Sequence, residues 1–240
     1  MVPPNPPESR IEEKHHARRS QGLRPHQRLQ LGAALCARLR SRLARTLGAE
    51  EADIPYTVRK LNAATDRPAD YFEEQPFGQV PSYRDGNISL FESGAIVLHI
   101  GRDCEALLPP EGAARTRATA WLIAALNSVE PFVMQLTTID VFCAGESWAK
   151  ERRPAVVEII GKRLSRLADA LGDKSYLDGD AFTAGDLMMT SVLRSLDGKD
   201  LIERHPNLVA YKARCLARPA FKAALAAQLA DFERREAVPA

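Results

Sequence analysis

The stretch that most constrains the fold is 77–96, in which two short strand patterns, a tight turn and a helix start follow one another closely. Residues 80–83 and 88–91 carry apolar and aromatic side chains of the kind that strands favour. Asp85 and Gly86 stand between them, and this dipeptide suits the positive φ angles of a hairpin turn. The sequence therefore predicts an antiparallel hairpin that leads directly into a helix.

Both junctions of this hairpin present polar groups. Val80-Pro81 stands where the first strand is entered, and Ser93, after Glu92, is placed to cap the helix. Exposed backbone groups and helix N-terminal N–H groups are sites at which peptides and anions bind. We therefore expect a small anionic peptide to bind at the two junctions. Apolar residues of the helix share one face: Ile96, Val97 and Ile100.

The sequence before this stretch divides into three parts. Residues 1–27 are rich in Pro, Arg, Glu and His with almost no large apolar side chains, so we expect a disordered extension. Residues 28–31 alternate like a short strand, and leucines then recur every fourth residue over 35–47, the period of a helical face that would stop at Gly48. Residues 54–61 mix β-branched and aromatic side chains, which predicts a second strand.

A short polar helix or turn is expected at 70–74, and helical periodicity dominates after a segment rich in Pro and Gly at 107–113. This segment is the predicted linker between an α/β domain over 28–106 and an all-α domain over 114–235, with a tail at 236–240. The main helices are expected at 115–135, 150–172, 187–193, 208–215 and 220–234.

Thr183 and Asp186 have the spacing of a capping box ahead of the apolar run 187–193. The hydroxyl can accept a hydrogen bond from the first turn, and the carboxylate can reach back to the capping residue. We therefore expect a central helix here, with Met188 and Met189 in the core.

The charge balance argues against two classes of partner. Lys and Arg number 33 and Asp and Glu number 31, so the net charge of +2 creates no field that would gather nucleic acid or acidic membranes. The longest apolar run, 120–126, is far shorter than the roughly 20 residues that cross a bilayer. We expect a cytoplasmic protein with no nucleic-acid partner and no membrane partner.

The four cysteines are widely spread, at positions 36, 104, 143 and 215, with no C-x-x-C pair among them. This spacing favours neither a zinc site nor a disulfide framework. We expect no bound metal, and we interpret the last three cysteines as small buried hydrophobic residues.

Four motifs in this order resemble the glutathione transferases: Pro76-Phe-Gly-Gln-Val-Pro81, Leu90-Phe-Glu-Ser-Gly-Ala-Ile96, Phe182-Thr-Ala-Gly-Asp-Leu187, and His205-Pro-Asn-Leu208 with Arg218-Pro-Ala-Phe221. The resemblance extends over about 55–232. It implies a thioredoxin-like α/β domain followed by an all-α domain. It also implies a homodimer in which the glutathione thiolate attacks a small hydrophobic electrophile, with glutathione as co-substrate and no other cofactor.

The resemblance also implies which residues hold glutathione. In the family the proline at the position of Pro81 is cis, which turns the N–H and C=O of Val80 toward the cysteinyl part of the peptide. The Glu92 carboxylate would face the γ-glutamyl ammonium, while Ser93 and the helix N-terminus face its carboxylate. Gly94 would let the ligand come close. The residues assigned to glutathione binding are thus Gln79, Val80, Pro81, Glu92 and Ser93.

The residue that activates the thiol is a Tyr, Ser or Cys at the start of the first helix in the family. If 28–31 is the first strand and 35–47 the first helix, Cys36 is the catalytic candidate, with Ser41 behind it. A second hypothesis is that the residues before about Asp53 are translated from a shifted or misassigned reading frame fused to a genuine domain, because family-like sequence begins abruptly near Ile54.

Two other functions stay open at this point. A thiol-disulfide oxidoreductase would act through Cys36, and a non-enzymatic interaction module would use the same fold without catalysis. For a transferase, the second substrate is expected over the helical domain near 127–148. Three side chains there are suited to line an apolar pocket: Phe132, Met134 and Trp148.

Overall fold

The computed structural model describes residues 46–59, 61 and 67–236. Several predicted features lie outside these residues: the extension 1–27, the strand 28–31, Cys36 and Ser41. The end of the predicted first helix is described, and it continues over 46–51 instead of stopping at Gly48. Gly48 is buried, and a Cβ there would lie 3.7 Å from Val97. At this distance a Cβ would make an ordinary van der Waals contact, so the neighbours do not require a glycine here, and the glycine does not end the helix.

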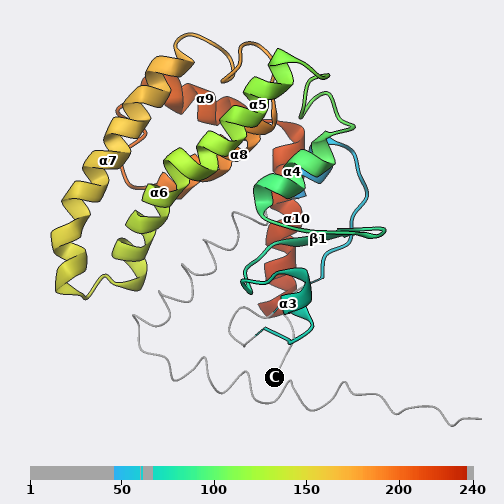
Figure 1. Ribbon diagram of the computed structural model, residues 1–240. Helices are drawn as coiled ribbons and strands as arrows, with labels where there is room; N and C mark the ends of the chain where they lie inside the picture. The colour runs from blue at the N-terminus through green and yellow to red at the C-terminus, as the bar shows by residue number, and fades with distance from the viewer. Residues whose placement is uncertain (1–45, 60, 62–66, 237–240) are drawn as a thin grey trace, which may run out of the picture.

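The N-terminal domain, described from residue 46 to 101, contains a two-stranded antiparallel sheet between helices (Figure 1). Its elements are α3 (Tyr71–Glu74), β1 (Ser82–Asp85), β2 (Ile88–Phe91) and α4 (Ser93–Gly101). Asp85 pairs with Ile88 across the turn, and Gly86 has a φ of +56°. The predicted hairpin and the short helix near 70–74 are confirmed. The turn lies one residue later than predicted, at Gly86 and Asn87, because Asp85 ends β1, which begins at Ser82 and not at Val80.

The strand predicted at 54–61 does not form within its described residues, 54–59 and 61. A strand exists through ladder hydrogen bonds to a neighbour, and no described residue supplies such a ladder to this segment. The neighbour expected for it, 28–31, lies outside the described residues. The alternating side chains indicated a strand, but periodicity alone does not supply a pairing partner.

Helix α4 buries Ile96, Val97 and Ile100, as its apolar face predicted. Its N-cap residue is Glu92, with Ser93 as the first helical residue, and no side chain caps the helix. The predicted Ser93 cap is therefore wrong. The turn after β2 places Glu92 at a φ of 67°, and this conformation starts the helix one residue later than the serine pattern indicated.

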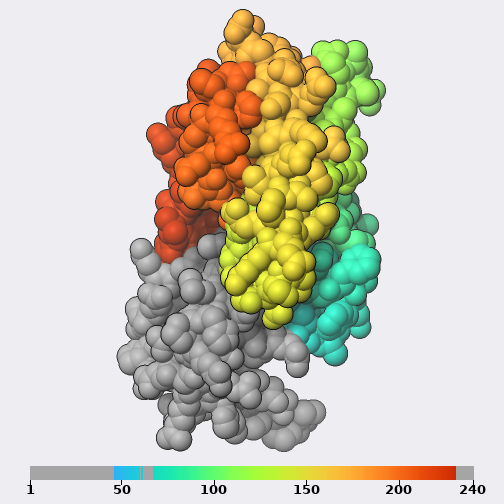
Figure 2. Space-filling model, turned by 90° about the vertical axis from the view of Figure 1, so that its left-hand side faces the viewer, coloured from blue at the N-terminus to red at the C-terminus, as the bar shows by residue number. Residues whose placement is uncertain are grey.

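The helical domain follows from residue 113 and confirms the predicted helical periodicity. Its elements are α5 (Ala113–Ala124), η2 (Ala125–Val129), α6 (Glu130–Thr137), η3 (Thr138–Phe142), α7 (Ser147–Leu171), α8 (Ala184–Leu193), η4 (Arg194–Leu196), α9 (Pro206–Leu216) and α10 (Pro219–Glu236). In Figure 2, α7 is flanked by α9 on one side and by the α5–α6 segment on the other.

The segment from α5 to η3 is one continuous helical rod with two π-helical turns, η2 and η3. In η2 the N–H of Glu130 reaches back to the carbonyl of Ala125, one residue further than in an α-helix. Pro131 follows directly and has no N–H to donate to Asn127, which accounts for the change of winding at this point.

One continuous hydrophobic core joins the two domains. Helix α8 is buried along its whole length and packs mainly against α5 (Figure 1). By length and composition alone, the rod Ala113–Phe142 would be long and apolar enough to cross a membrane. This rod packs on α8, α7 and α4, and 39% of its apolar window is buried.

The capping box before α8 is confirmed. The Thr183 hydroxyl accepts a hydrogen bond from the Gly185 N–H at 3.2 Å, and the Asp186 carboxylate accepts from the Thr183 N–H at 2.9 Å. Asp186 also accepts from the Leu177 N–H at 2.8 Å and from the Tyr211 hydroxyl at 3.0 Å. This carboxylate thus joins three segments in the interior of the helical domain.

Candidate functional site

The loop that leads to β1 is held by hydrogen bonds from its own neighbourhood. The Gln75 side-chain oxygen accepts from the backbone N–H groups of Phe77 at 2.7 Å and Gln79 at 3.1 Å. The Tyr71 hydroxyl donates to the Gln79 carbonyl at 2.6 Å, and Arg67 Nε donates to the Gly78 carbonyl at 3.0 Å. Because Tyr71 and Gln75 are each 2% exposed, these bonds fix the loop from inside the fold.

The loop ends at Val80, which precedes the hairpin and takes no part in the ladder of hydrogen bonds between β1 and β2. The Val80-Pro81 peptide bond is cis, as the family resemblance implied. Among the described residues, neither the N–H nor the C=O of Val80 has a hydrogen-bond partner. Backbone groups presented in this way can pair with an extended peptide as a neighbouring strand would.

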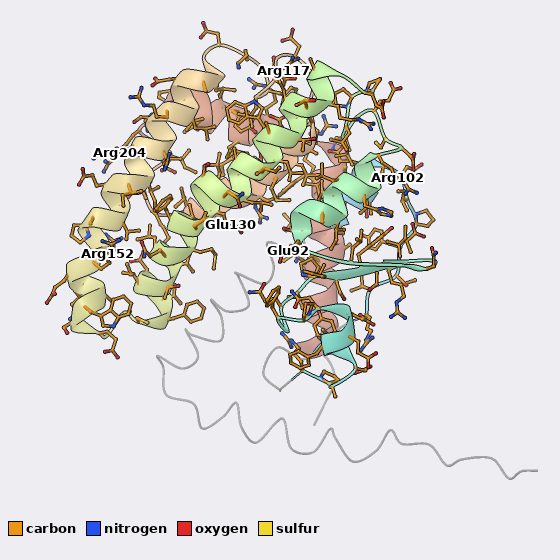
Figure 3. The ribbon with its side chains drawn as sticks, in the orientation of Figure 1. Glu92, Arg102, Arg117, Glu130, Arg152 and Arg204 are labelled. Carbon is orange, nitrogen blue, oxygen red and sulfur yellow. The ribbon has the colours of Figure 1, made fainter. Side chains whose placement is uncertain are left out.

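Glu92 and Ser93 lie at the same end of the hairpin as Val80, where β2 runs into α4. Figure 3 labels Glu92 at this junction. Glu92 is exposed, and within the described part of the chain its carboxylate has no ion-pair or hydrogen-bond partner. Ser93 begins α4, so its hydroxyl lies beside the unsatisfied N–H groups of the first helical turn. A carboxylate next to helix N-terminal donors can bind a zwitterion: the ammonium at Glu92 and the anionic group at the helix.

The backbone at Glu92 supports the same interpretation. A φ of 67° is uncommon for a residue with a Cβ, and such conformations cluster at ligand sites where the surrounding structure holds them. Here β2 precedes Glu92 directly and α4 follows it, so both flanking segments are fixed. The conformation directs the chain from the sheet into the helix and keeps the side chain on the exposed surface.

Gly94 has a different role from the one expected. Instead of lying open to a ligand, it is buried, and a Cβ built on it would lie 2.7 Å from Leu126 Cδ1 and 3.1 Å from Leu122 Cδ2. The glycine therefore lets the N-terminus of α4 pack closely against the α5–η2 segment. This contact brings the helical domain next to the site formed by Val80, Glu92 and Ser93.

Gln79 contributes in an unexpected way. Its side chain is exposed, while its backbone N–H and C=O are bound by Gln75 and Tyr71. The supporting roles of Tyr71, Gln75 and Arg67 were missed from the sequence. The signal was an aromatic residue and a glutamine just before the Phe77 to Pro81 motif, in a segment interpreted as a polar turn.

The thiol-activating candidates, Cys36 and Ser41, lie outside the described residues. The three described cysteines are free thiols. Burial raises the pKa of Cys215 to about 11, so this thiol is not ionised near neutral pH. Cys104 donates to the Glu51 carbonyl with Sγ 3.6 Å from the oxygen, and it lies in the segment after α4. Within the described ranges, His, Cys, Asp and Glu form no group of three or more able to hold a metal ion.

Comparison with known proteins gives two family matches. The family described as "Glutathione S-transferase, N-terminal domain" matches residues 37–102, and "Glutathione S-transferase, C-terminal domain" matches 137–228. The first match starts well before Ile54, so the prediction that family-like sequence begins near that residue is wrong. The buried Leu47 agrees with this, since it packs in the common core.

Two curated plant relatives extend over most of the chain. A glutathione S-transferase of Hyoscyamus muticus is 28% identical over 194 residues, which cover 77% of this chain and 91% of the relative. Glutathione S-transferase 4 of Zea mays is 28% identical over 189 residues, covering 72% of this chain and 82% of the relative.

Solved structures share the fold. Glutathione transferase F2 of Populus trichocarpa superposes with a TM-score of 0.72 at 24% identity, covering 80% of this chain and 96% of that one. A glutathione transferase family member of Pseudomonas fluorescens, solved with two glutathione molecules bound, gives a TM-score of 0.72 at 23% identity, covering 78% and 88%. The two domain matches, the curated relatives and the shared architecture show that this chain belongs to the glutathione S-transferase family.

Proposed function

We propose that this enzyme conjugates the thiolate of glutathione to a small hydrophobic electrophile. The observation that carries the proposal is the pair of junctions at one end of the hairpin. Val80, next to a cis proline, has an N–H and a C=O with no partner in the described part of the chain, and Glu92 stands at the N-terminus of α4. Together they match the chemistry of a γ-glutamyl peptide: an extended backbone, an ammonium group and a carboxylate.

The electrophile would bind on the helical side, near 127–148. Phe132 and Met134 on α6 are half-buried, and Trp148 at the start of α7 is exposed. The Arg163 guanidinium lies 5.5 Å from the centre of the Phe132 ring, which leaves that ring's face partly occupied. Met134 and Trp148 are therefore the stronger candidates for apolar contact with a second substrate.

Cys36 is the proposed thiol-activating residue, with Ser41 as the alternative. A Cys or Ser at a helix start benefits from the positive end of the helix dipole, which stabilises a nearby thiolate. Replacing Cys36 by Ala and, separately, Ser41 by Ala distinguishes the two assignments, since alanine cannot stabilise the thiolate. Loss of conjugation in one variant with retained glutathione binding identifies the activating residue.

The proposed assembly is a cytoplasmic homodimer. Phe77 is 70% exposed, and its ring meets that of Phe91 edge-on with centroids 6.2 Å apart. Exposed aromatic rings on a rigid loop are typical of contact surfaces between subunits. Phe77→Ala should shift the protein toward monomer in sedimentation experiments at low micromolar concentration, while Phe72→Ala on α3 serves as a control for removal of another exposed ring.

Glutathione recognition is tested with Glu92→Gln and Ser93→Ala, measured by calorimetry and by retention on immobilised glutathione. Losing a hydrogen bond to a charged group costs about 1.5–3 kcal/mol, so Glu92→Gln should weaken glutathione about 10- to 100-fold. Two exposed residues of the same types outside the site serve as controls: Glu73→Gln on α3 and Ser89→Ala on β2. Equal affinity in Glu92→Gln and Glu73→Gln would contradict the proposed site.

Conjugation of a chlorinated aromatic compound by the parent enzyme then separates the alternatives. A transferase binds glutathione and forms the conjugate. An oxidoreductase instead reduces a disulfide substrate, and Cys36→Ser abolishes that reduction. An interaction module shows neither reaction.

A further inference from the structure

An ion pair joins two residues that lie far apart in the chain, Glu51 and Arg218. Arg218 Nε lies 2.6 Å from Glu51 Oε1, and its second nitrogen lies 2.7 Å from Glu51 Oε2. The Glu51 side chain is 5% exposed and that of Arg218 is 26% exposed. A two-point pair of this kind fixes orientation as well as distance, because both parallel hydrogen bonds are lost when either group rotates.

Both ends of this pair stand on fixed backbone. Glu51 is the last residue of the helix at 46–51, where the N–H of Ala52 bonds to the Gly48 carbonyl at 3.1 Å. Arg218 lies between α9 and α10: its N–H bonds to the Cys215 carbonyl at 3.3 Å, and its carbonyl accepts from Lys222. The pair therefore connects two backbone segments, one in each domain, that are each fixed by hydrogen bonds.

The guanidinium also lies over the ring of Phe182, 4.0 Å from its centroid. Phe182 is buried just ahead of α8, the central helix of the helical domain. Arg218 thus stacks on an aromatic ring of its own domain, while two nitrogens of its guanidinium group bond to Glu51 in the other domain. By contrast, Arg117 pairs with Asp178 entirely within the helical domain.

Other contacts between the domains are apolar or use backbone carbonyls: Arg115 on α5, for example, donates to the Arg102 carbonyl after α4 at 3.2 Å. Leu122 and Leu126 pack over Gly94, and this apolar contact has no preferred direction along the interface. The Ala184 N–H donates to the Leu107 carbonyl at 2.7 Å, which holds the connecting segment. Apolar surfaces bring the domains together, and the Glu51–Arg218 pair adds a directional constraint between them.

We propose that Glu51 and Arg218 are positioning residues for catalysis, because they set the register of the N-terminal domain against the helical domain. This inference rests on the proposed transferase function. Glutathione is held by residues 79–93 of one domain, whereas the electrophile meets the other domain. The reacting atoms therefore come together only when the domains keep their register, and a displacement near 1 Å costs on the order of 100-fold in rate.

The decisive variants are Glu51→Gln and Arg218→Met. Each removes the pair while keeping a side chain of similar length. We expect kcat/KM for the electrophile to fall about tenfold, with glutathione affinity within twofold of the parent. Arg218→Lys retains the charge but not the fork, so its kcat/KM should lie between those of the parent and Arg218→Met. Arg117→Met, which removes an ion pair inside the helical domain, should leave both kcat/KM for the electrophile and the affinity for glutathione unchanged.

A merely structural role predicts a different pattern. It would lower the melting temperature of both Glu51→Gln and Arg218→Met, while the folded protein would keep the parent's kcat/KM for the electrophile. A glutathione affinity that falls in parallel with kcat/KM would likewise overturn the proposal. In the double variant, the loss should equal that of either single variant, because both changes remove the same interaction.

A measurement that needs no activity tests the coupling of the domains directly. The two tryptophans, Trp121 and Trp148, both lie in the helical domain, so their fluorescence follows that domain while far-UV circular dichroism follows both. In the parent we expect coincident urea transitions by the two probes. In Arg218→Met the two midpoints should separate. If the parent forms no conjugate, the proposed function fails, yet this separation still supports the coupling; coincident midpoints in Arg218→Met contradict it.

Discussion

Replacement of Gly94 by Ala tests whether the proposed glutathione site depends on close packing between the domains. The added Cβ would lie 2.7 Å from Leu126 Cδ1 and 3.1 Å from Leu122 Cδ2, where ordinary contacts are about 3.5–4.0 Å. The neighbouring side chains must therefore yield by up to about 1 Å. Leu126 is half-buried and can rotate, but Leu122 is 1% exposed and has little room.

Overpacking of this kind costs about 1–3 kcal/mol, and we expect about 2 kcal/mol here because one of the two neighbours can move. Part of the strain should appear as displacement of α4, whose first turn carries Ser93. Glutathione affinity should therefore fall about tenfold, and urea unfolding should show the lower stability. Calorimetry at one temperature and tryptophan fluorescence in urea measure the two effects on the same samples.

The double variant Gly94→Ala/Leu126→Ala distinguishes the two explanations for this glycine. If the Cβ clashes with Leu126, shortening that side chain should restore most of the lost affinity, relative to Leu126→Ala alone. If Gly94 instead gives the ligand room, the second change restores nothing. Absence of rescue, together with unchanged stability in Gly94→Ala, would refute the packing argument.

Three further predictions concern the supports of the site and the core. Asp186→Ala should lower the free energy of unfolding by about 4 kcal/mol, measured in urea, because it orphans two buried backbone N–H groups and two hydroxyls. Tyr71→Phe removes the bond to the Gln79 carbonyl and should weaken glutathione about two- to tenfold by calorimetry, with the fold intact. Burial alone would raise the pKa of Asp140, but hydrogen bonds from Arg153 and Lys199 outweigh it and lower the pKa. The stability that this gives is present above the unfolded value of about 3.9 and is lost as pH falls through the lower folded value, so Asp140→Asn should destabilise at pH 7 and match the parent near pH 2.

Local patterns were sufficient for the features that depend on neighbouring residues. The hairpin, the apolar face of α4 and the Thr183 capping box each follow from residues that are close together in the sequence, although the turn at Gly86 and Asn87 lies one residue later than the Asp85-Gly86 pattern indicated. The cis bond before Pro81 was implied by the family resemblance and is present. No local pattern could have supplied it, since most X-Pro bonds are trans.

The predictions that were wrong have a common physical cause: each depended on contacts with residues far away in the sequence. The strand at 54–61 needed a neighbour for its ladder. Gly48 was interpreted as a helix stop, but it lies buried within the helix, beside Val97. Gly94 was likewise assigned to the ligand because the opposing residue, Leu126, lies in another domain. A glycine in a sequence shows that a Cβ is absent, and only the fold shows what occupies the space.

The proposed binding of the two substrates therefore depends on contacts that span different distances along the sequence. The hydrogen bonds that fix the loop proposed to bind glutathione join Tyr71, Gln75 and Arg67 to residues at most 11 positions away. The pair proposed to hold the electrophile side in register, Glu51 and Arg218, spans 167 positions. Substitutions in the helical domain should consequently alter the choice of electrophile while glutathione affinity stays constant. The exceptions should be residues such as those that pack over Gly94, because there the helical domain itself contacts the start of α4.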